Sequence, residues 1–265
     1  MRMFRKSPRF AALVLGLSAA TSSAASAATI AALQDGTTIV WIDTEQKKVT
    51  GSVVLASGAK LIGIDVRPAD GKLYGLAPDG AIVTVDAKTG VWQKVSQLSE
   101  ALPAGVPMAV DFNPVADRMR VIGGNGLNLR VNVIDGKAAV DTMLKYAPTD
   151  AAMNKTPMVT AAGYTNSMAG AKETALYDVD TTAGTLLKQA PPNDGVLTTV
   201  GSLGVTLDGP AAFDVWSDGT GKHVGWLLNG GRLHTVDLGT GAATALGAIA
   251  GLKGRVIDIA LLPAM

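Results

Sequence analysis

The sequence has 265 residues and contains no cysteine, two histidines, and only four each of tryptophan, tyrosine and phenylalanine. The lack of cysteine excludes disulfides and thiol chemistry, so a hydrophobic core has to hold the fold, and a chain of this length can bury one. The small number of aromatic residues argues against a glycan-binding protein with several stacking platforms. We expect His223 and His234 to be structural or exposed rather than catalytic.

Several motifs of common enzymes and nucleic-acid binders are also missing. The sequence has neither the G-x-S-x-G pattern of a serine nucleophile nor the H-E-x-x-H pattern of a zinc protease. The glycine-rich segment 123–128 (GGNGLN) lies between two strand-like runs, so it is expected to form a hairpin turn rather than a phosphate loop. Because no basic stripe is present, we expect no nucleic-acid partner.

Residues 1–27 have the pattern of a secretory signal peptide. Four basic residues precede the apolar run FAALVLGLSAA and a stretch of small residues. Cleavage is expected after Ala27, or one residue later after Ala28, which leaves residues 28–265 as a single domain with a net charge of −3. The apolar run is too short to span a bilayer and no second one follows. We therefore expect a periplasmic or extracellular protein without a membrane span after signal removal.

From about residue 60 onward the sequence repeats one β-rich pattern roughly every 45 residues. The openings of the repeats are LIGIDVRP (61–68), PMAVDFNP (107–114), VTAAGYTNS (159–167), PAAFDVWSD (210–218) and VIDIALLP (256–263). Short runs rich in valine and isoleucine follow, separated by glycine turns, and no helical periodicity accompanies them. The pattern predicts an all-β protein, a β-propeller built from blades of four antiparallel strands.

The two ends of the repeat region complete each other. The last opening has no room after it for three further strands, whereas the segment beginning at residue 29 has the appearance of three strands that lack an inner one. We therefore predict five blades, with the ring closed by strands from both ends, and six blades as the alternative. The expected blades are 29–58 with 254–263, 59–104, 105–157, 158–207 and 208–253.

Four of the five openings share an aspartate, which is placed in the innermost strand of its blade. These residues are Asp65, Asp111, Asp214 and Asp258. One interpretation is that the carboxylates converge on a cation, for which Ca²⁺ is the candidate because it accepts six to eight oxygen ligands. The other is that each aspartate accepts backbone hydrogen bonds and has the same packing role in every blade. The opening of the fourth blade has no aspartate, which argues against a symmetric ring of ligands.

A second polar cluster is expected in the third blade. Asn128, Arg130 and Asn132 alternate with apolar residues, so that a strand would place all three on one face, and Arg120 lies across the predicted turn. If buried, the arginines need acceptors, and Asp111 and Asp65 are chemically suitable. An inter-blade polar network and a carboxylate-binding pocket are the two interpretations.

Three turn-rich loops, 147–157, 165–173 and 191–195, are candidates for a binding surface. Four methionines lie around the first two loops: Met143, Met153, Met158 and Met168. They would form either an adaptable apolar rim or, as is more common, fill gaps in the packing.

The same segments resemble a family of secreted bacterial proteins known as domain of unknown function 4394. The matching phrases are LIGIDVRPADGKLYGL (61–76), AVDFNPVADRMRVIGGNGLNLRVNV (109–133), ALYDVD (175–180), PPNDGVLTTVGSLGV (191–205) and AAFDV (211–215). The resemblance implies an exported, propeller-like protein. It implies no activity and no catalytic residues.

The sequence leaves two functional classes. The first is a non-catalytic binding or scaffold protein that holds a small-molecule, glycan or protein ligand at a propeller face. The second is a cation-dependent hydrolase or lyase that acts at the mouth of the channel, with the inner-strand aspartates holding the metal. The absence of catalytic motifs favours the first class.

Overall fold

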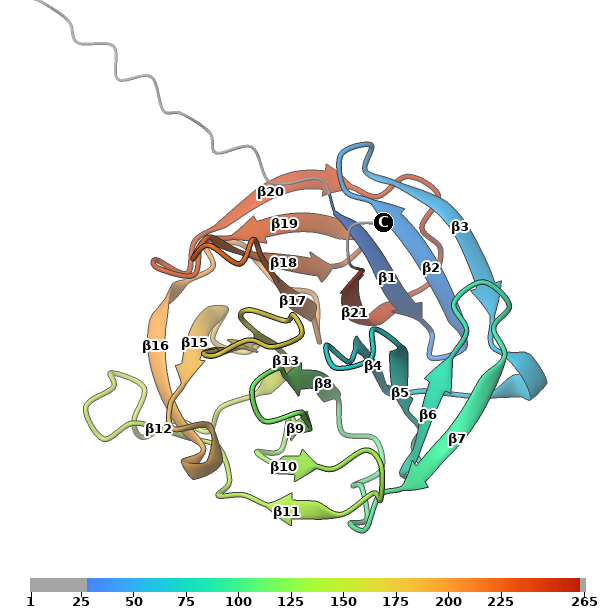
Figure 1. Ribbon diagram of the computed structural model, residues 1–265. Coiled ribbons are helices and arrows are strands. Elements are labelled where there is room, and N and C mark those ends of the chain that lie inside the picture. The colour runs from blue at the N-terminus through green and yellow to red at the C-terminus, as the bar shows by residue number, and fades with distance from the viewer. Residues whose placement is uncertain (1–27, 263–265) are drawn as a thin grey trace, which may run out of the picture.

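A computed structural model describes residues 28–262, which form a five-bladed β-propeller (Figure 1). Blade one contains β21 (Val256–Leu262), β1 (Thr29–Gln34), β2 (Thr38–Asp43) and β3 (Lys48–Val54). Blade two contains β4 (Gly63–Val66), β5 (Leu73–Leu76), β6 (Ala81–Val85) and β7 (Trp92–Gln97). Blade three contains β8 (Met108–Asn113), β9 (Arg118–Gly123), β10 (Asn128–Val131) and β11 (Ala138–Val140).

Blades four and five complete the ring. Blade four contains β13 (Val159–Tyr164), β14 (Leu176–Asp180), β15 (Thr185–Gln189) and β16 (Val196–Ser202). It also has a fifth strand that the repeat did not predict, β12 (Lys145–Tyr146), which pairs in parallel with β16. Blade five contains β17 (Ala212–Ser217), β18 (His223–Asn229), β19 (Arg232–Val236) and β20 (Ala243–Ala248). Two single-turn 3₁₀ helices, η1 (Ala56–Gly58) and η2 (Pro192–Asp194), lie between strands.

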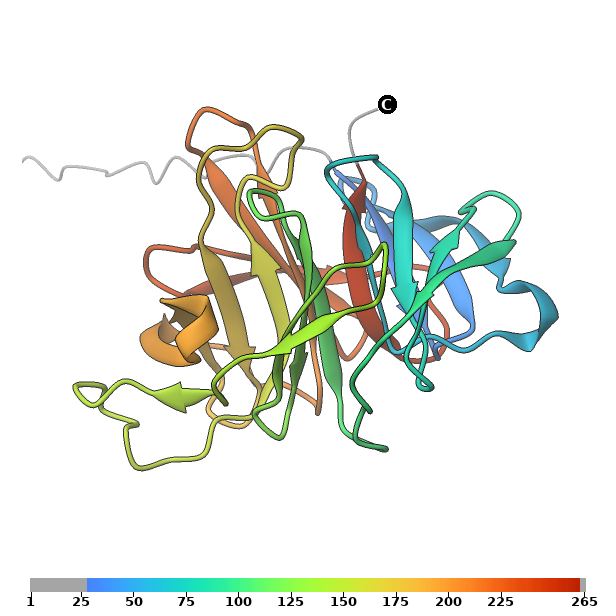
Figure 2. The same ribbon diagram turned by 60° about the horizontal axis from the view of Figure 1, so that its bottom comes forward.

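The predicted ring closure is confirmed. The last strand, β21, pairs antiparallel with β1 from Thr29 opposite Leu262 to Gln34 opposite Val256. Blade one is therefore assembled from segments at the two ends of the described chain, which meet on one face of the ring, uppermost in Figure 2. Closure in this way removes an unpaired edge that would otherwise invite pairing with other chains.

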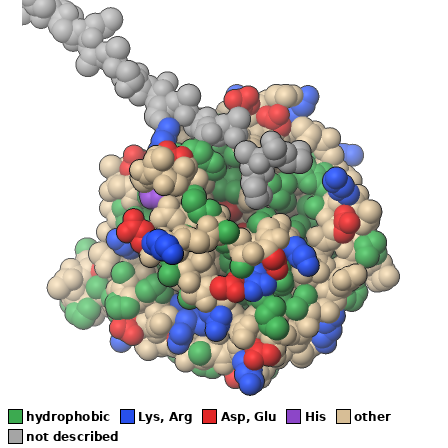
Figure 3. All heavy atoms as spheres, in the orientation of Figure 1, with side chains coloured by type: hydrophobic (Ala, Val, Ile, Leu, Met, Phe, Trp, Pro, Cys, Tyr) green, Lys and Arg blue, Asp and Glu red, His purple; other side chains and the backbone are tan. Residues whose placement is uncertain are grey.

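The opposite face, lowest in Figure 2, is where the five inner strands begin, and we call it the entry face. It carries the segments that lead into β4, β8, β13, β17 and β21, together with the turns that join the second and third strands of each blade. The other face is shown in Figure 3, where acidic and basic side chains are interspersed and neither sign gathers into a large patch.

The core is divided into the interfaces between neighbouring blades, because each sheet buries both of its faces. Between blades two and three, Tyr74 and Phe112 meet edge to face with ring centroids 5.4 Å apart. Between blades one and five, Trp226 packs among apolar residues of β1 and β2. No helix within residues 28–262 is long and apolar enough to cross a membrane.

The predicted signal peptide, residues 1–27, lies outside the described residues, and so does Ala27 of the expected cleavage site. Ala28, the alternative cleavage residue, is described. Its backbone N–H donates to Oγ1 of Thr44 (3.0 Å), and its carbonyl accepts from the Thr44 backbone and hydroxyl. The cleavage position remains a prediction.

Candidate functional site

The repeated aspartates of the inner strands link neighbouring blades. Oδ2 of Asp258 in β21 accepts from the backbone N–H of Ile64 in β4 (2.9 Å). Oδ2 of Asp65 accepts from Phe112 in β8 (2.7 Å). The remaining two continue the pattern: Asp111 accepts from Tyr164 in β13 (3.1 Å) and Asp214 accepts from Leu261 in β21 (2.7 Å). We call these four bonds the aspartate clasps.

Three of the four clasp residues use their second oxygen as well. Oδ1 of Asp65, Asp214 and Asp258 accepts from the backbone N–H of the next residue, at 2.6, 2.6 and 3.0 Å. The side chains therefore lie between adjacent inner strands. This arrangement matches the interpretation that the aspartates have the same packing role in each blade.

The clasp carboxyls also influence one another electrically. All four are buried, and burial is the main cause that raises the pKa of each. Repulsion from Asp214 raises the pKa of Asp65 further, and repulsion from Asp65 does the same for Asp111. The pKa of Asp214 itself is raised to about 6. Within the part of the chain that the structure describes, no group of three or more acidic or histidine side chains has the arrangement of a metal site.

The polar cluster of blade three is only partly as predicted. Nη1 of Arg120 donates to Oδ1 of Asn128 (2.8 Å) and to Oδ2 of Asp141 (2.7 Å), and Arg130 binds both oxygens of Asp141 (2.7 and 2.9 Å). The expectation that Asp111 or Asp65 would pair with these arginines is wrong, because both carboxylates are engaged in clasps while Asp141 approaches from the segment after β11. Asn132 is also misplaced by the prediction. It lies beyond the end of β10, where its Oδ1 accepts from Ile134 in a turn (3.1 Å).

Arg120 connects this cluster to blade four. Its Nε donates to the hydroxyl of Tyr164 (3.2 Å), and its Nη2 donates to Oδ1 of Asn193 in η2 (2.9 Å). The side chain of Arg120 is only 3% exposed and that of Asp141 only 5%. Of the two interpretations, this geometry corresponds to the inter-blade network, since the donors of Arg120 point at protein groups.

One buried titratable group near this network was not singled out from the sequence. Asp178 of β14 is fully buried, and neither of its oxygens has a hydrogen-bond partner among the described residues. Burial raises its pKa to about 8, and the nearby Arg120 lowers it only in part. Its sequence signal is weak: an aspartate inside the segment ALYDVD (175–180), which also ends in Asp180.

The methionines differ from the expectation that they fill packing gaps. Met143, Met153 and Met158 are exposed, and Met168 is half-buried. Of the two histidines, His234 is buried in β19, and Nδ1 of His223 lies 2.8 Å from the hydroxyl of Ser217.

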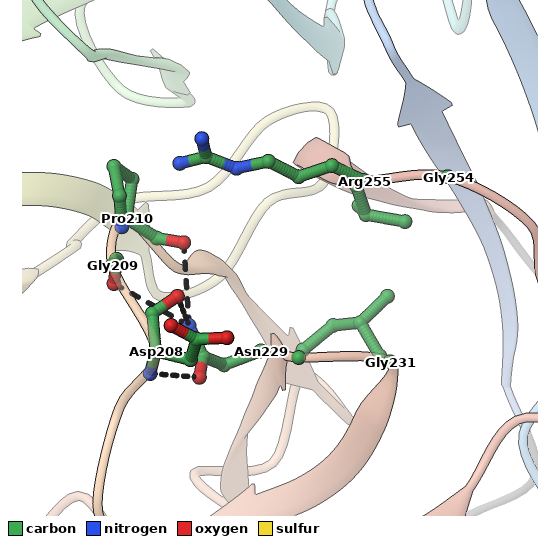
Figure 4. A pocket seen from close by; sticks show the side chains of 10 residues that line it. Asp208, Gly209, Pro210, Asn229, Gly231, Gly254 and Arg255 are labelled. Atoms are coloured by element: carbon green, nitrogen blue, oxygen red, sulfur yellow. Dashed lines mark hydrogen bonds between the residues drawn. The ribbon is translucent and has the colours of Figure 1, made fainter.

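A polar pocket of about 320 Å³ opens on the entry face between blades five and one (Figure 4). Three segments form it: the approach to β17, the turn between β18 and β19, and the approach to β21. Its lining residues are Asp208, Gly209, Pro210, Leu228, Asn229, Gly230, Gly231, Gly254, Arg255 and Val256. Leu228 and Val256 also belong to the apolar packing between the two blades, so the lining combines apolar and polar groups.

One wall of the pocket is held by Asn229, which is 7% exposed. Its Oδ1 accepts from the backbone N–H of Asp208 (2.7 Å). Its Nδ2 donates toward the carbonyls of residues 208, 209 and 210 at 3.2–3.4 Å (dashed lines in Figure 4). A single buried amide thus fixes the backbone of this wall.

Asp35 holds the other wall. Its Oδ1 accepts from the backbone N–H of Arg255 (2.9 Å), and its own backbone N–H donates to the Arg255 carbonyl (2.8 Å). Gly254 is required beside this contact, because a Cβ there would collide with Oδ2 of Asp35. The sequence did not reveal this pocket, since most of its lining residues lie in turns and connecting segments or at strand ends, and only Pro210 and Val256 belong to the repeated openings.

The chain is similar to known proteins in two ways, in sequence to one family and in fold to several solved structures. A family model described as "Domain of unknown function (DUF4394)" matches residues 39–260. A search of curated proteins finds no match. A protein of unknown function from Bacteroides thetaiotaomicron VPI-5482 is 15% identical, with a TM-score of 0.54, and the match covers 88% of this chain but only 64% of that one.

Two further solved structures are similar at lower TM-scores. One is a protein of unknown function from Bacteroides caccae, 13% identical with a TM-score of 0.43 over 85% of this chain and 74% of that chain. The other is an auxiliary nutrient binding protein from Bacteroides ovatus ATCC 8483, 18% identical with a TM-score of 0.44 over 71% and 50%.

Proposed function

The chain belongs to the DUF4394 family, whose description assigns no activity, and we propose from its geometry that it is an exported, non-catalytic binding or scaffold protein. The ligand, which is a small molecule, a glycan or a protein, would bind at a face of the propeller. The export part of this proposal rests on the sequence of residues 1–27.

The observation that carries the proposal is the use of the four repeated aspartates. As clasps, they connect blade one to two, two to three, three to four and five to one through backbone N–H groups. Buried carboxylates that already accept such bonds are poorly placed to act as general bases or nucleophiles. They stabilise a rigid ring on which surface loops can present a binding site.

A cation-dependent hydrolase or lyase is the second candidate, and one observation favours it. Repulsion from neighbouring clasp carboxyls contributes to the raised pKa of Asp65, Asp111 and Asp258, and a bound cation such as Ca²⁺ would reduce that repulsion. In that case Asp65, Asp111, Asp214 and Asp258 would hold the metal at the channel, and the metal would activate water or polarise the substrate.

The melting temperature separates the two candidates. The signal-free protein is melted after exhaustive chelation and again with Ca²⁺ restored, because a ligand that binds only the folded state stabilises it. The binding or scaffold proposal predicts no calcium-dependent shift, together with no turnover on panels of glycoside, ester and peptide substrates. A reversible rise in melting temperature, with hydrolysis that disappears in Asp111→Asn, would instead establish the metal-dependent enzyme.

A further inference from the structure

We propose that the entry-face pocket between blades five and one binds the carboxylate of a small polar ligand through Arg255, while Asp208 accepts a hydrogen bond from a neighbouring hydroxyl or ammonium group. This inference rests on the proposed binding function and gives it a site and a ligand class. The shared chemistry, a carboxylate flanked by hydrogen-bond donors, is that of sugar acids and of α-amino acids.

The first argument is that the backbone of Arg255 is held in place while its guanidinium makes no polar contact with residues 28–262. Its backbone is bonded to Asp35 through both its N–H and its carbonyl. Its guanidinium has no hydrogen bond or ion pair with any residue from 28 to 262. By contrast, Arg67, Arg120 and Arg130 each contact a carboxylate.

The second argument is that the guanidinium reaches across the pocket. A Cβ placed at Gly209, on the opposite wall, would lie 3.8 Å from Nη2 of Arg255. In Figure 4 the side chain extends from Arg255 toward Pro210 on the opposite wall, and Asp208 lies on that same wall, further along the segment that leads into β17. A cationic and an anionic group thus face one cavity without pairing with each other.

The third argument is that glycines keep part of the pocket free of side chains. Gly209, Gly230 and Gly231 all have positive φ, and the nearest atoms to a Cβ at these positions would be 3.8–4.0 Å away. Glycine therefore leaves open volume there and exposes backbone groups to a ligand. The volume of about 320 Å³ is at the lower end of small-molecule sites.

The chemistry of the lining selects the ligand class. A planar guanidinium binds a carboxylate through two parallel N–H donors. A phosphate dianion would bring more negative charge beside Asp208 and Asp35, so a monoanion with adjacent donors is the better complement. Because Asn229 and Asp35 already fix both walls, binding requires little reorganisation of the backbone.

The test uses the protein from residue 28 onward and three probes: glucuronate, its neutral counterpart glucose, and alanine. Binding is measured by calorimetry and by the change in melting temperature. The variants are Arg255→Ala, Asp208→Asn and, as the matched control, Arg232→Ala, because Arg232 is an exposed arginine of blade five that does not line the pocket. Both pocket variants change exposed side chains, so the fold should persist, and unaltered melting without probe verifies this.

We expect glucuronate or alanine to bind and glucose to bind at least about tenfold more weakly, as loss of a charge-assisted hydrogen bond implies. Arg255→Ala should weaken binding by a similar factor and Asp208→Asn by less, while Arg232→Ala should match the unsubstituted protein. Preference for glucuronate identifies the sugar-acid class, and preference for alanine the amino-acid class. Failure of both carboxylates to bind, or equal binding by Arg255→Ala, would overturn the inference. Neither result would refute the broader binding function, which only catalytic turnover would do.

Discussion

Gly163 in β13 lies so close to Val215 in β17 that a Cβ on the glycine would be 3.0 Å from Cγ2 of Val215 and 3.2 Å from the Cα of Asp214. In the repeat, Gly163 occupies the position that is aspartate in the other four inner strands. Blades four and five are thus joined by close approach of their backbones instead of by a clasp.

Gly163→Ala should therefore destabilise the protein, because the added methyl group forces two inner strands apart. We expect a loss of about 1–3 kcal/mol in the free energy of unfolding, the usual cost of overpacking, measured by urea denaturation. Gly239→Ala, at an exposed turn, is the control and should change little. Unchanged stability of Gly163→Ala would show that the strands can separate without cost.

Because Asp65 forms a clasp, its substitution should lower the free energy of unfolding, by an amount that depends on the replacing residue. Asp65→Ala leaves the buried N–H groups of Val66 and Phe112 without their acceptor, which should cost roughly 1–3 kcal/mol for each unsatisfied group. Asp65→Asn keeps one oxygen acceptor and should lose less. Chemical denaturation of both variants measures the difference, and equal losses would mean that the carboxyl oxygens do not serve as the acceptors.

Asp178 predicts a pH dependence. Its native pKa is raised to about 8 from an ordinary value of 3.8, so between these values the folded protein holds a proton that the unfolded chain releases. Stability contributed by this group is complete below about pH 4 and declines as the pH rises toward 8. Asp178→Asn removes the titration and should be the more stable protein at about pH 8, by about 1 kcal/mol or more. Parallel pH profiles of the two proteins in urea unfolding would contradict this.

Asp141 is the common acceptor of two arginines, so its neutralisation should be costly. Asp141→Asn leaves Arg120 buried without its counter-ion, and we expect a loss of about 3–5 kcal/mol in unfolding free energy. The control is Asp135→Asn, whose partner Lys137 is exposed and 3.9 Å distant, with an expected loss of at most about 1 kcal/mol. Similar effects of the two substitutions would show that Asp141 does not anchor the network.

The sequence was most informative where it repeats. The spacing of Asp65, Asp111, Asp214 and Asp258, with the truncated final opening, was sufficient to predict five blades and the closing strand. The two-residue strand β12 carries too few residues to show a period. The pairing of Arg120 could not be predicted from the sequence. Its acceptor, Asp141, lies 21 residues further along the chain, after the outermost strand, and only the folded structure brings it next to Arg120.

The pocket was hidden for a related reason. Asp208 and Arg255 lie in the segments that lead into β17 and β21, Asn229 is the last residue of β18, and nothing in their local sequence distinguishes them from ordinary turns. Only the curvature of the ring brings them to one cavity. The sequence repeat therefore predicts the propeller, whereas a pocket formed by residues that do not repeat is seen only in the structure.

The pairing of β21 with β1 also sets the order in which the molecule can form. During synthesis, β1 is the first strand of the ring to emerge, whereas its neighbour at residues 256–262 follows all the other strands, and so does Leu261, the donor to Asp214. Until β21 emerges, β1 lacks its inner partner and Asp214 lacks its backbone donor in blade one. Completion of the first blade and its connection to the last blade consequently depend on the same strand, which is synthesised after every other strand of the ring.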